Sequence, residues 1–327
     1  MLHRILRSIV EVFKQGTSAS LTLFKVMIPI VFAVRLLQEF DLIRLLADPL
    51  GPVMRLVGLP PEMGLVWATA LLNNIYSGMI VFLSLVENAP ITEAQATVLG
   101  VMVLIAHGLP VELSIARKSG PRLFFQGLSR VGGALLLGWL LSQIYTNFDL
   151  LQGPANVLLQ PEAGTGPVPW GPWILDQAVN LISIYGIILA LVGIMRILEA
   201  VGVINLANRL LRPLLRIIGI GPKASAITVV GLTLGLSYGG GLIIHGARSG
   251  EIDRRDVFYS LTLMGVCHSL VEDTFLLVML GGHLSGLLWG RLFYSLFFVA
   301  LLVQLVRYLP GRFCDRFFWG PPESKGA

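Results

Sequence analysis

Two short polar sequences interrupt apolar segments of the chain and contain residue types that do chemistry. His107 is followed five residues later by Glu112, and His268 is followed by Glu272 and Asp273. Each histidine thus has a carboxylate five residues later, and Glu272, four residues after His268, lies on the same helical face as His268. Ionisable side chains inside an apolar segment are expensive to bury and by default mark a functional site. These residues are therefore the first candidates for a site.

Three kinds of chemistry are open for the two histidines. An imidazole titrates near neutral pH, so the pair could bind a polar substrate, with Ser269 beside it, or carry a proton. Imidazole, carboxylate and thiolate groups also bind divalent transition metals, and the metal candidates are His107, His268, Cys267 and Glu272. A structural hydrogen bond between helices is the third interpretation. The spacing matches no recognised catalytic or metal-binding pattern, so we predict neither an enzyme nor a cofactor.

A second set of polar and glycine residues lies before each histidine, in the sequences NNIYSG (73–78) and GLSYGGG (235–241). Asparagine and serine both donate and accept hydrogen bonds, which suits an uncharged polar solute. Glycine allows tight turns and a close approach of the backbone. Alternatively, these small residues only let helices pack closely. The candidate substrate-binding residues from these sequences are Asn73, Asn74, Tyr76, Ser77, Ser237, Tyr238 and Gly239.

The composition predicts the environment of these residues. Of the 327 residues, 55% are hydrophobic and 13% are charged, whereas a soluble domain has roughly 25% charged residues. We therefore predict an all-α integral membrane protein whose first partner is the lipid bilayer, with about six to eight spans of ~20 residues. The net charge of +5 comes from basic residues between apolar runs, which indicates membrane orientation rather than a nucleic-acid partner.

The chain repeats itself without gaps at an offset of 161 residues. This offset pairs His107 with His268 and Glu112 with Asp273. Matches at Pro, Arg, Gly and His at one offset are informative where apolar matches are not, and fixed-period similarity is typical of repeated architectures. Further pairs are Arg35 with Arg196, Pro52 with Pro213, Arg55 with Arg216, Gly58 with Gly219, Pro61 with Pro222, Gly78 with Gly239, Gly120 with Gly281, and Arg130 with Arg291.

The charges of the loops predict that the two repeats have inverted orientations. The loop 87–93 has no basic residue, yet its equivalent 248–254 is basic, and the basic loop 117–122 corresponds to the neutral residues 281–283. Basic loops face the cytoplasm, so equivalent loops are expected on opposite sides. Inversion requires an odd number of crossings per repeat, which holds if 62–87 and 223–247 are re-entrant hairpins. The alternative is full spans and parallel repeats.

These considerations give a domain plan and a location. We predict an amphipathic interfacial helix (1–17), a first repeat (18–146), an extracytoplasmic linker (147–171), a second repeat (172–309) and a cytoplasmic tail (310–327). Each repeat has an interfacial helix, a re-entrant hairpin and about three spans. Both termini are expected in the cytoplasm, and the location is predicted to be a bacterial inner membrane.

The order of interfacial helix, glycine-containing hairpin and interrupted span resembles the Gate, or nucleoside-recognition, domain family. The residues that carry the resemblance are Gly235 to Ile243, Asn73 to Gly78, and the polar interruption from Cys267 to Asp273. That family includes parts of concentrative nucleoside transporters, the membrane region of ferrous-iron transporter B and the spore maturation proteins. The resemblance implies a transport core of hairpins and broken helices. The chain departs from the iron transporter in having no GTPase domain, and from nucleoside transporters in having few accessory helices.

The leading functional hypothesis is a secondary transporter that moves a small polar solute, such as a nucleoside-like one, through a midplane site between two hairpins and two broken helices. One alternative is passage of a divalent metal through the His, Glu, Asp and Cys residues. Another is a non-transporting protein that assembles with itself as a homodimer or with a second membrane protein.

Overall fold

The computed structural model describes residues 2–40, 42–86, 89–158 and 169–320 of the chain. Within these ranges the regular elements are helical, and the β-structure is limited to two isolated bridges, Thr92 with Pro154 and Pro121 with Trp319. The prediction of an all-α fold is therefore confirmed.

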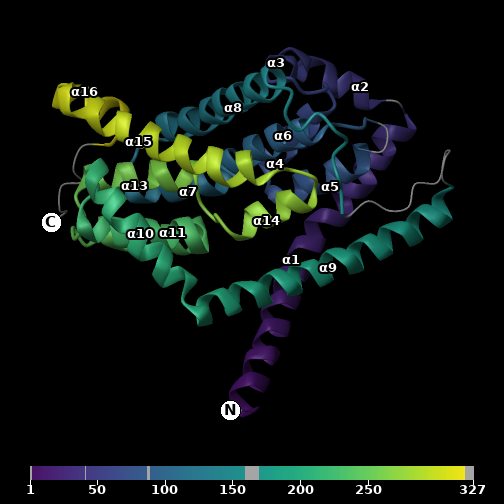
Figure 1. Cartoon of the computed structure of the whole chain (residues 1–327), viewed down its shortest axis with the longest axis horizontal. Helices are drawn as coiled ribbons and strands as arrows, with labels where there is room; N and C mark the ends of the chain where they lie inside the picture. The colour runs from purple at the N-terminus through teal and green to yellow at the C-terminus, as the bar shows by residue number, and fades with distance from the viewer. Residues whose placement is uncertain (1, 41, 87–88, 159–168, 321–327) are drawn as a thin grey trace.

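The first half of the chain forms helices that end before the linker (Figure 1). Their bounds are α1 Leu2–Glu39, α2 Leu42–Ala47, η1 Asp48–Leu50, α3 Gly51–Leu56, α4 Met63–Leu72, α5 Ile75–Leu85, α6 Glu93–Ile105, α7 Leu109–Ser119 and α8 Leu123–Asn147.

The second half has the same order of elements. Their bounds are α9 Trp170–Val201, α10 Val203–Ile218, α11 Pro222–Leu234, α12 Leu236–Arg248, α13 Arg254–Val266, α14 Glu272–Met279, the π-helical turn η2 Ser285–Gly290, α15 Arg291–Tyr308 and α16 Gly311–Phe317.

The offset of 161 residues found in the sequence reappears in the backbone. Helices α6 and α13 begin and end at positions related by that offset. The residues that end them, Ala106 (φ −133°, ψ 74°) and Cys267 (φ −145°, ψ 54°), have nearly the same conformation. Two residues further on, Gly108 (φ 57°) and Ser269 (φ 46°) are both left-handed, a conformation that is uncommon for a residue with a side chain. The two halves therefore interrupt their central helix in the same way.

Two predicted element boundaries differ from the structure. The amphipathic segment 1–17 and the first span form one helix, α1, because Gly16 destabilises a helix interior by only about 1 kcal/mol and apolar residues continue beyond it. The predicted interfacial helix 41–59 is three short pieces, with Pro49 and Pro52 at the start of the second and third. Proline removes a backbone donor and is most easily accommodated in the first turn of a helix.

Each half contains a tight helical hairpin. The turns lie at Asn73 and Asn74 between α4 and α5, and at Gly235 between α11 and α12. A Cβ atom on Gly78 would lie 2.7 Å from the Cβ of Ala70, and one on Gly239 would lie 2.5 Å from the Cα of Gly231. The two arms of each hairpin thus fold back on each other at a glycine. That these hairpins are re-entrant in a bilayer remains a prediction.

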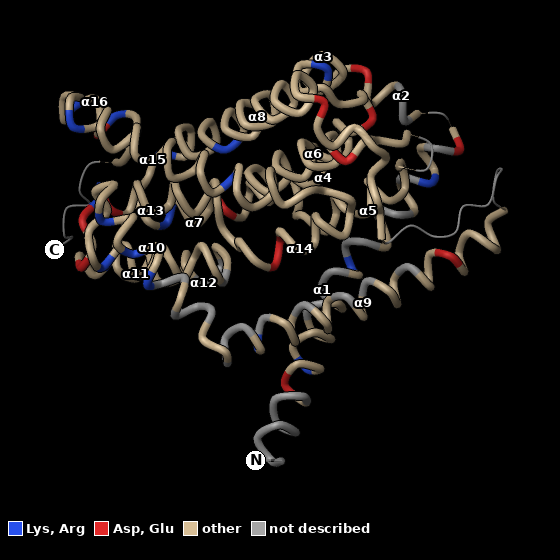
Figure 2. Tube along the Cα trace, in the orientation of Figure 1, with Lys and Arg blue, Asp and Glu red and all other residues tan. Residues whose placement is uncertain are grey.

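The basic loops lie together at one end of the molecule. The N–H of Arg122 donates to Phe318 O (2.8 Å), Arg254 Nη1 donates to Gly320 O (2.8 Å), and Lys223 Nζ is 3.9 Å from Glu251 Oε2. Figure 2 shows Lys and Arg gathered at this end, around α10, α11, α13 and α16.

The opposite end contains the loops that are poor in basic residues. There, the N–H of Glu93 donates to Gly153 O (2.9 Å), and the N–H of His283 donates to Thr97 Oγ1 (2.8 Å). Loops 117–122 and 281–283, which are equivalent in the two repeats, therefore lie at opposite ends of the helices. Inverted repeats require this arrangement. The orientation in a membrane remains a prediction.

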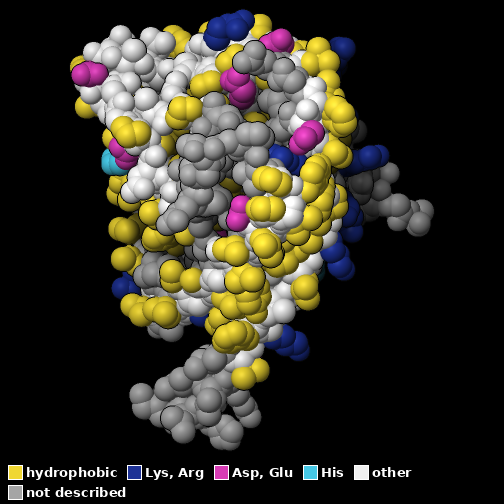
Figure 3. Space-filling view, turned by 90° about the vertical axis from the view of Figure 1, so that its right-hand side faces the viewer, with side chains coloured by type: hydrophobic (Ala, Val, Ile, Leu, Met, Phe, Trp, Pro, Cys, Tyr) yellow, Lys and Arg dark blue, Asp and Glu magenta, His cyan; other side chains and the backbone are white. Residues whose placement is uncertain are grey.

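The surface of the described helices is suited to a bilayer. Four segments are long and apolar enough to cross one: Glu93–Ser119, Leu123–Asn147, Trp170–Ile194 and Ser285–Tyr308. On α15, the side chains of Phe293, Phe297 and Leu301 recur on one face and are 66%, 70% and 58% exposed. Figure 3 shows many hydrophobic side chains on the face of the molecule that it presents. In water such a face would be unfavourable, whereas lipid tails solvate it.

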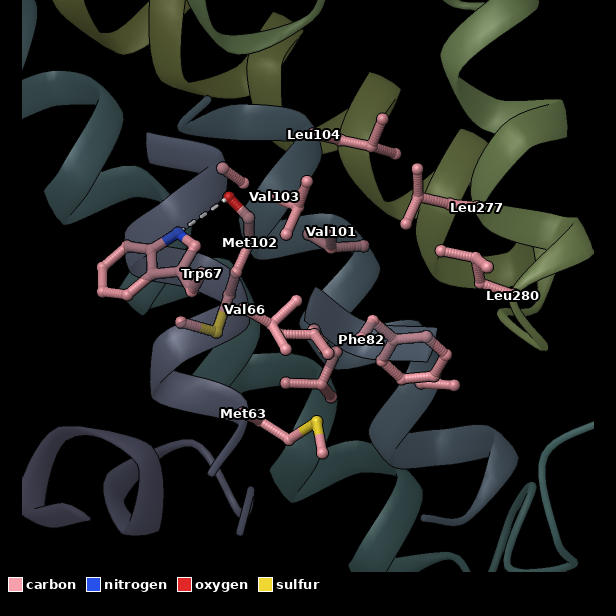
Figure 4. Packing of buried hydrophobic residues seen from close by; sticks show 14 of the residues in the cluster. Met63, Val66, Trp67, Phe82, Val101, Met102, Val103, Leu104, Leu277 and Leu280 are labelled. Atoms are coloured by element: carbon pink, nitrogen blue, oxygen red, sulfur yellow. Dashed lines mark hydrogen bonds between the residues drawn. The ribbon is translucent and has the colours of Figure 1, made fainter. Parts of the chain in front are cut away.

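The core of the first half packs against the second half. Trp67 on α4 donates its indole N–H to Met102 O on α6 (3.3 Å). Leu277 of α14 and Leu280, the residue after that helix, belong to the same buried cluster as Phe82 (Figure 4). Helix α14 of the second repeat is thus fixed against α6 of the first. This contact brings the two helix interruptions close together.

Candidate functional site

The two interrupted helices place their histidines face to face. The Nε2 atoms of His107 and His268 are 3.2 Å apart, and the side chains are nearly completely buried. Each Nδ1 atom lies 2.9 Å from the backbone carbonyl oxygen four residues earlier, that of Val103 or Met264. The pairing of His107 with His268 in the sequence is therefore a direct contact in the structure.

The hydrogen bonds to the carbonyls determine which ring nitrogen bears hydrogen. A carbonyl oxygen only accepts, so Nδ1 of both His107 and His268 must donate. In the neutral imidazoles both Nε2 atoms then carry a lone pair, and no hydrogen lies between these two nitrogens. Two acceptors at 3.2 Å repel each other. The geometry therefore favours a cation, either a proton or a metal ion, between them.

Glu112 completes a triangle with the two histidines. Its Oε1 atom lies 3.6 Å from His107 Nε2 and 3.5 Å from His268 Nε2. Its Oε2 atom forms an ion pair with Arg130 Nη1. Arg130 also donates from Nε to Ile105 O (2.8 Å) and from Nη2 to His107 O (2.9 Å), the carbonyls freed where α6 ends. Arg130 thus satisfies the helix interruption and orients Glu112.

Asp273 is the carboxylate that the second repeat adds. Its carboxylate and the ring nitrogens of His107 and His268 lie within 4.8 Å of one another, and all three residues are buried. We call His107, Glu112, His268 and Asp273 the central cluster. Glu272, which the sequence offered as a metal ligand, does not belong to the group of possible ligands. Its Oε1 accepts a hydrogen bond from Tyr76 Oη (3.3 Å).

The arginine of the second repeat is bonded differently from its equivalent. Arg291 is completely buried, and its Nη2 donates to Thr274 Oγ1 at 3.4 Å. Its Nε and Nη1 atoms have no hydrogen-bond partner among the described residues. Cys267, another metal candidate, is buried near Arg291 and Ser295 and does not belong to the group of possible metal ligands.

The first hairpin tip is held by bonds within itself. Asn73 Nδ2 donates to Ser77 Oγ (2.8 Å), and Asn74 Oδ1 accepts from the backbone N–H of Ser77 (2.9 Å), which makes Asn74 the N-cap of α5. Such caps satisfy helix donors that would otherwise be unpaired. Two of the predicted solute-binding groups thus have a structural role in this conformation.

The other predicted residues divide between contacts across the repeats and packing. Tyr76 reaches Glu272 on α14 and so links the first hairpin to the second repeat. Ser269 lies at the second hairpin tip, since a Cβ on Gly235 would be 2.8 Å from its Oγ. Gly239 provides the close approach of α12 to α11. Ser237 and Tyr238 lie in α12, and their side chains are outside the described part of the structure.

Sequence reasoning missed the roles of two arginines. Arg130 and Arg291 were matched as a pair at the offset of 161 residues but were given no function. The available signal was a basic residue inside an otherwise apolar span in both copies. Such residues in membrane proteins are paired with carboxylates or backbone carbonyls.

Comparison with known proteins finds a family whose model matches part of the second repeat. Residues 181–283, from within α9 to the loop after α14, match the Gate family, described as nucleoside recognition. The match covers about a third of the chain. The resemblance drawn from the hairpin and the interrupted helix is therefore confirmed over this segment, which includes His268 and Asp273 of the central cluster.

A relative extends the similarity beyond the Gate domain. The chain is 26% identical over 270 residues to the uncharacterized membrane protein YvoD of Bacillus subtilis (strain 168), a match that covers 81% of this chain and 84% of the relative. No solved structure matches at a significant level. The similarity to a membrane protein and the long apolar helices together indicate an integral membrane protein.

Proposed function

We propose that the protein is a secondary transporter that moves a small polar solute through the centre of the membrane. One observation carries the proposal: two interrupted helices, one from each repeat, meet at the central cluster inside an otherwise apolar molecule. Transporters with inverted repeats place their sites at such interruptions, because interrupted helices free backbone groups for a solute or ion. The Gate domain favours a nucleoside-like solute and a role in transport rather than catalysis.

The contact between Tyr76 and Glu272 supports a site shared by both repeats. A phenol hydroxyl and a carboxylate, both partly buried, can bind the hydroxyl or amide groups of a solute once they separate. Movement of the first hairpin away from α14 would break this contact and open a path to the central cluster. Alternating access would then be a motion of one repeat against the other.

Uptake by the full-length protein in proteoliposomes tests the proposal. Radiolabelled uridine and adenosine are the probes, with a proton or sodium gradient imposed. We expect uptake above that of empty liposomes, a loss of at least tenfold in Glu272→Ala, and normal uptake in Glu251→Ala, whose carboxylate is on the surface. Absence of uptake for both nucleosides under both gradients would refute nucleoside transport. Co-purification of a second membrane protein in that case would favour the assembly function instead.

A second candidate is passage of a divalent metal ion. The specific observation in its favour is the buried group of His107, His268 and Asp273. Flux of Zn²⁺ into liposomes that contain a fluorescent zinc indicator tests it. Flux that persists when both histidines are replaced by alanine would contradict this route.

A further inference from the structure

We propose that His107, His268 and Glu112 bind one divalent first-row transition metal ion, with Asp273 as the fourth ligand. This inference concerns binding at equilibrium and does not depend on transport. It rests on the distances within the central cluster, on the lone pairs that the two Nε2 atoms carry and on the groups that hold the ligands in place.

The three distances within the cluster match those of a metal site. The Nε2 atoms are 3.2 Å apart, and Glu112 Oε1 is 3.6 and 3.5 Å from them. Ligand atoms bound tetrahedrally to Zn²⁺ at about 2.0–2.1 Å are about 3.4 Å from one another. An ion near the centre of this triangle would therefore be at bonding distance from all three atoms without rearrangement of the side chains.

The hydrogen bonds around the cluster prepare the ligands for a metal. Histidines that bind metals usually donate the other ring N–H to a carbonyl or carboxylate, and this bond orients the ring. His107 and His268 do this with Val103 O and Met264 O, each at 2.9 Å. Glu112 is held on its other oxygen by Arg130. All three donor groups are thus held in place by other bonds before any ion arrives.

Asp273 would be the fourth ligand of the ion, and the chemistry of the four ligands limits which metals can bind. The ligand atoms of Asp273 and the two histidines lie within 4.8 Å of one another, so a small movement of the carboxylate would bring it to the same ion. Two imidazoles with carboxylates suit Zn²⁺, Fe²⁺, Co²⁺ or Mn²⁺. Mg²⁺ and Ca²⁺ prefer oxygen ligands alone, so they should not compete. A shared proton is the alternative occupant of the space between the histidines.

The test is metal binding by the full-length protein, purified in detergent with a tag that lacks histidine and stripped of metal with EDTA. The probes are Zn²⁺ by titration calorimetry and elemental analysis, and Co²⁺ by its visible spectrum. We expect about one Zn²⁺ per chain, an intense tetrahedral Co²⁺ spectrum, and no displacement by millimolar Mg²⁺. X-ray absorption should give nitrogen or oxygen neighbours at about 2.0–2.1 Å, with the signature of two imidazoles.

Variants separate the cluster from other histidines. His107→Ala and His268→Ala should each lose stoichiometric binding, while His245→Ala, which changes an exposed histidine, should retain it. The wild-type measurement alone remains decisive if a variant misfolds. Wild-type protein that binds no Zn²⁺, or a folded double histidine variant that binds it as well as wild type, would overturn the proposal. Metal binding without nucleoside uptake would refute only the proposed transport function.

Discussion

Arg130 and Glu112 form an ion pair inside the first repeat, and the equivalent Arg291 in the second repeat does not reproduce its bonds. Arg130 donates to a carboxylate and to two backbone carbonyls, whereas two guanidinium nitrogens of Arg291 have no hydrogen-bond partner among the described residues. The two halves thus share a fold but differ in the bonding at their centre.

Replacement of Arg130 should destabilise the protein strongly. Arg130→Met leaves Glu112 as an unpaired buried charge and two carbonyls without donors, which typically costs about 3–5 kcal/mol. We expect a clear fall in thermal unfolding temperature in detergent. Arg117→Met, on the exposed face of α7, is the control and should change little. An unfolding temperature near that of the wild type for Arg130→Met would contradict the role assigned to this residue.

Replacement of Arg291 should have a smaller effect than replacement of Arg130. Donors that are buried without partners already cost about 1–3 kcal/mol, so Arg291→Met removes unsatisfied groups along with one weak bond to Thr274. We expect a change in unfolding temperature well below that of Arg130→Met. The comparison of the two variants in the same detergent measures the asymmetry directly, and equal losses would show that the two arginines are equivalent.

Gly239 should be intolerant of a methyl group for steric reasons. A Cβ at this position would lie 2.5 Å from Gly231 Cα, and overpacking of this kind costs about 1–3 kcal/mol. The matched control is Gly241→Ala in the same helix, where a Cβ meets nothing within 4 Å. The control should be neutral or slightly stabilising, because alanine is the better helix former. Equal unfolding temperatures for the two variants would refute the packing role of Gly239.

Equivalent loops should be accessible from opposite sides of the membrane. Pro90→Cys and Glu251→Cys introduce exposed thiols in loops related by the repeat, and both native cysteines are buried. An impermeant maleimide added outside right-side-out membrane vesicles should label only the Pro90→Cys variant. The Glu251→Cys variant should be labelled only after the vesicles are permeabilised. If both variants are labelled from the same side, the inverted repeat is refuted.

The sequence by itself determined the helical class, the repeat and the two histidines of the central cluster. Composition excludes a soluble domain, because 13% charged residues cannot cover a water-exposed surface. The offset of 161 residues predicted the pairing of His107 with His268, since each histidine occupies the same place in its repeat. These features depend on local pattern and on comparison of the chain with itself, so one sequence is sufficient to find them.

Only the tertiary structure decided how the cluster is built. The choice of Asp273 rather than Glu272, the exclusion of Cys267, and the pairing of Glu112 with Arg130 depend on the rotation of each helix segment after its interruption. The left-handed conformation of Gly108 or Ser269 sets that rotation. Helical periodicity cannot predict this conformation, because both residues lie in the break between two helices. The same limit explains the hairpin tip, where Asn73 and Asn74 look like solute-binding groups but bond within the turn.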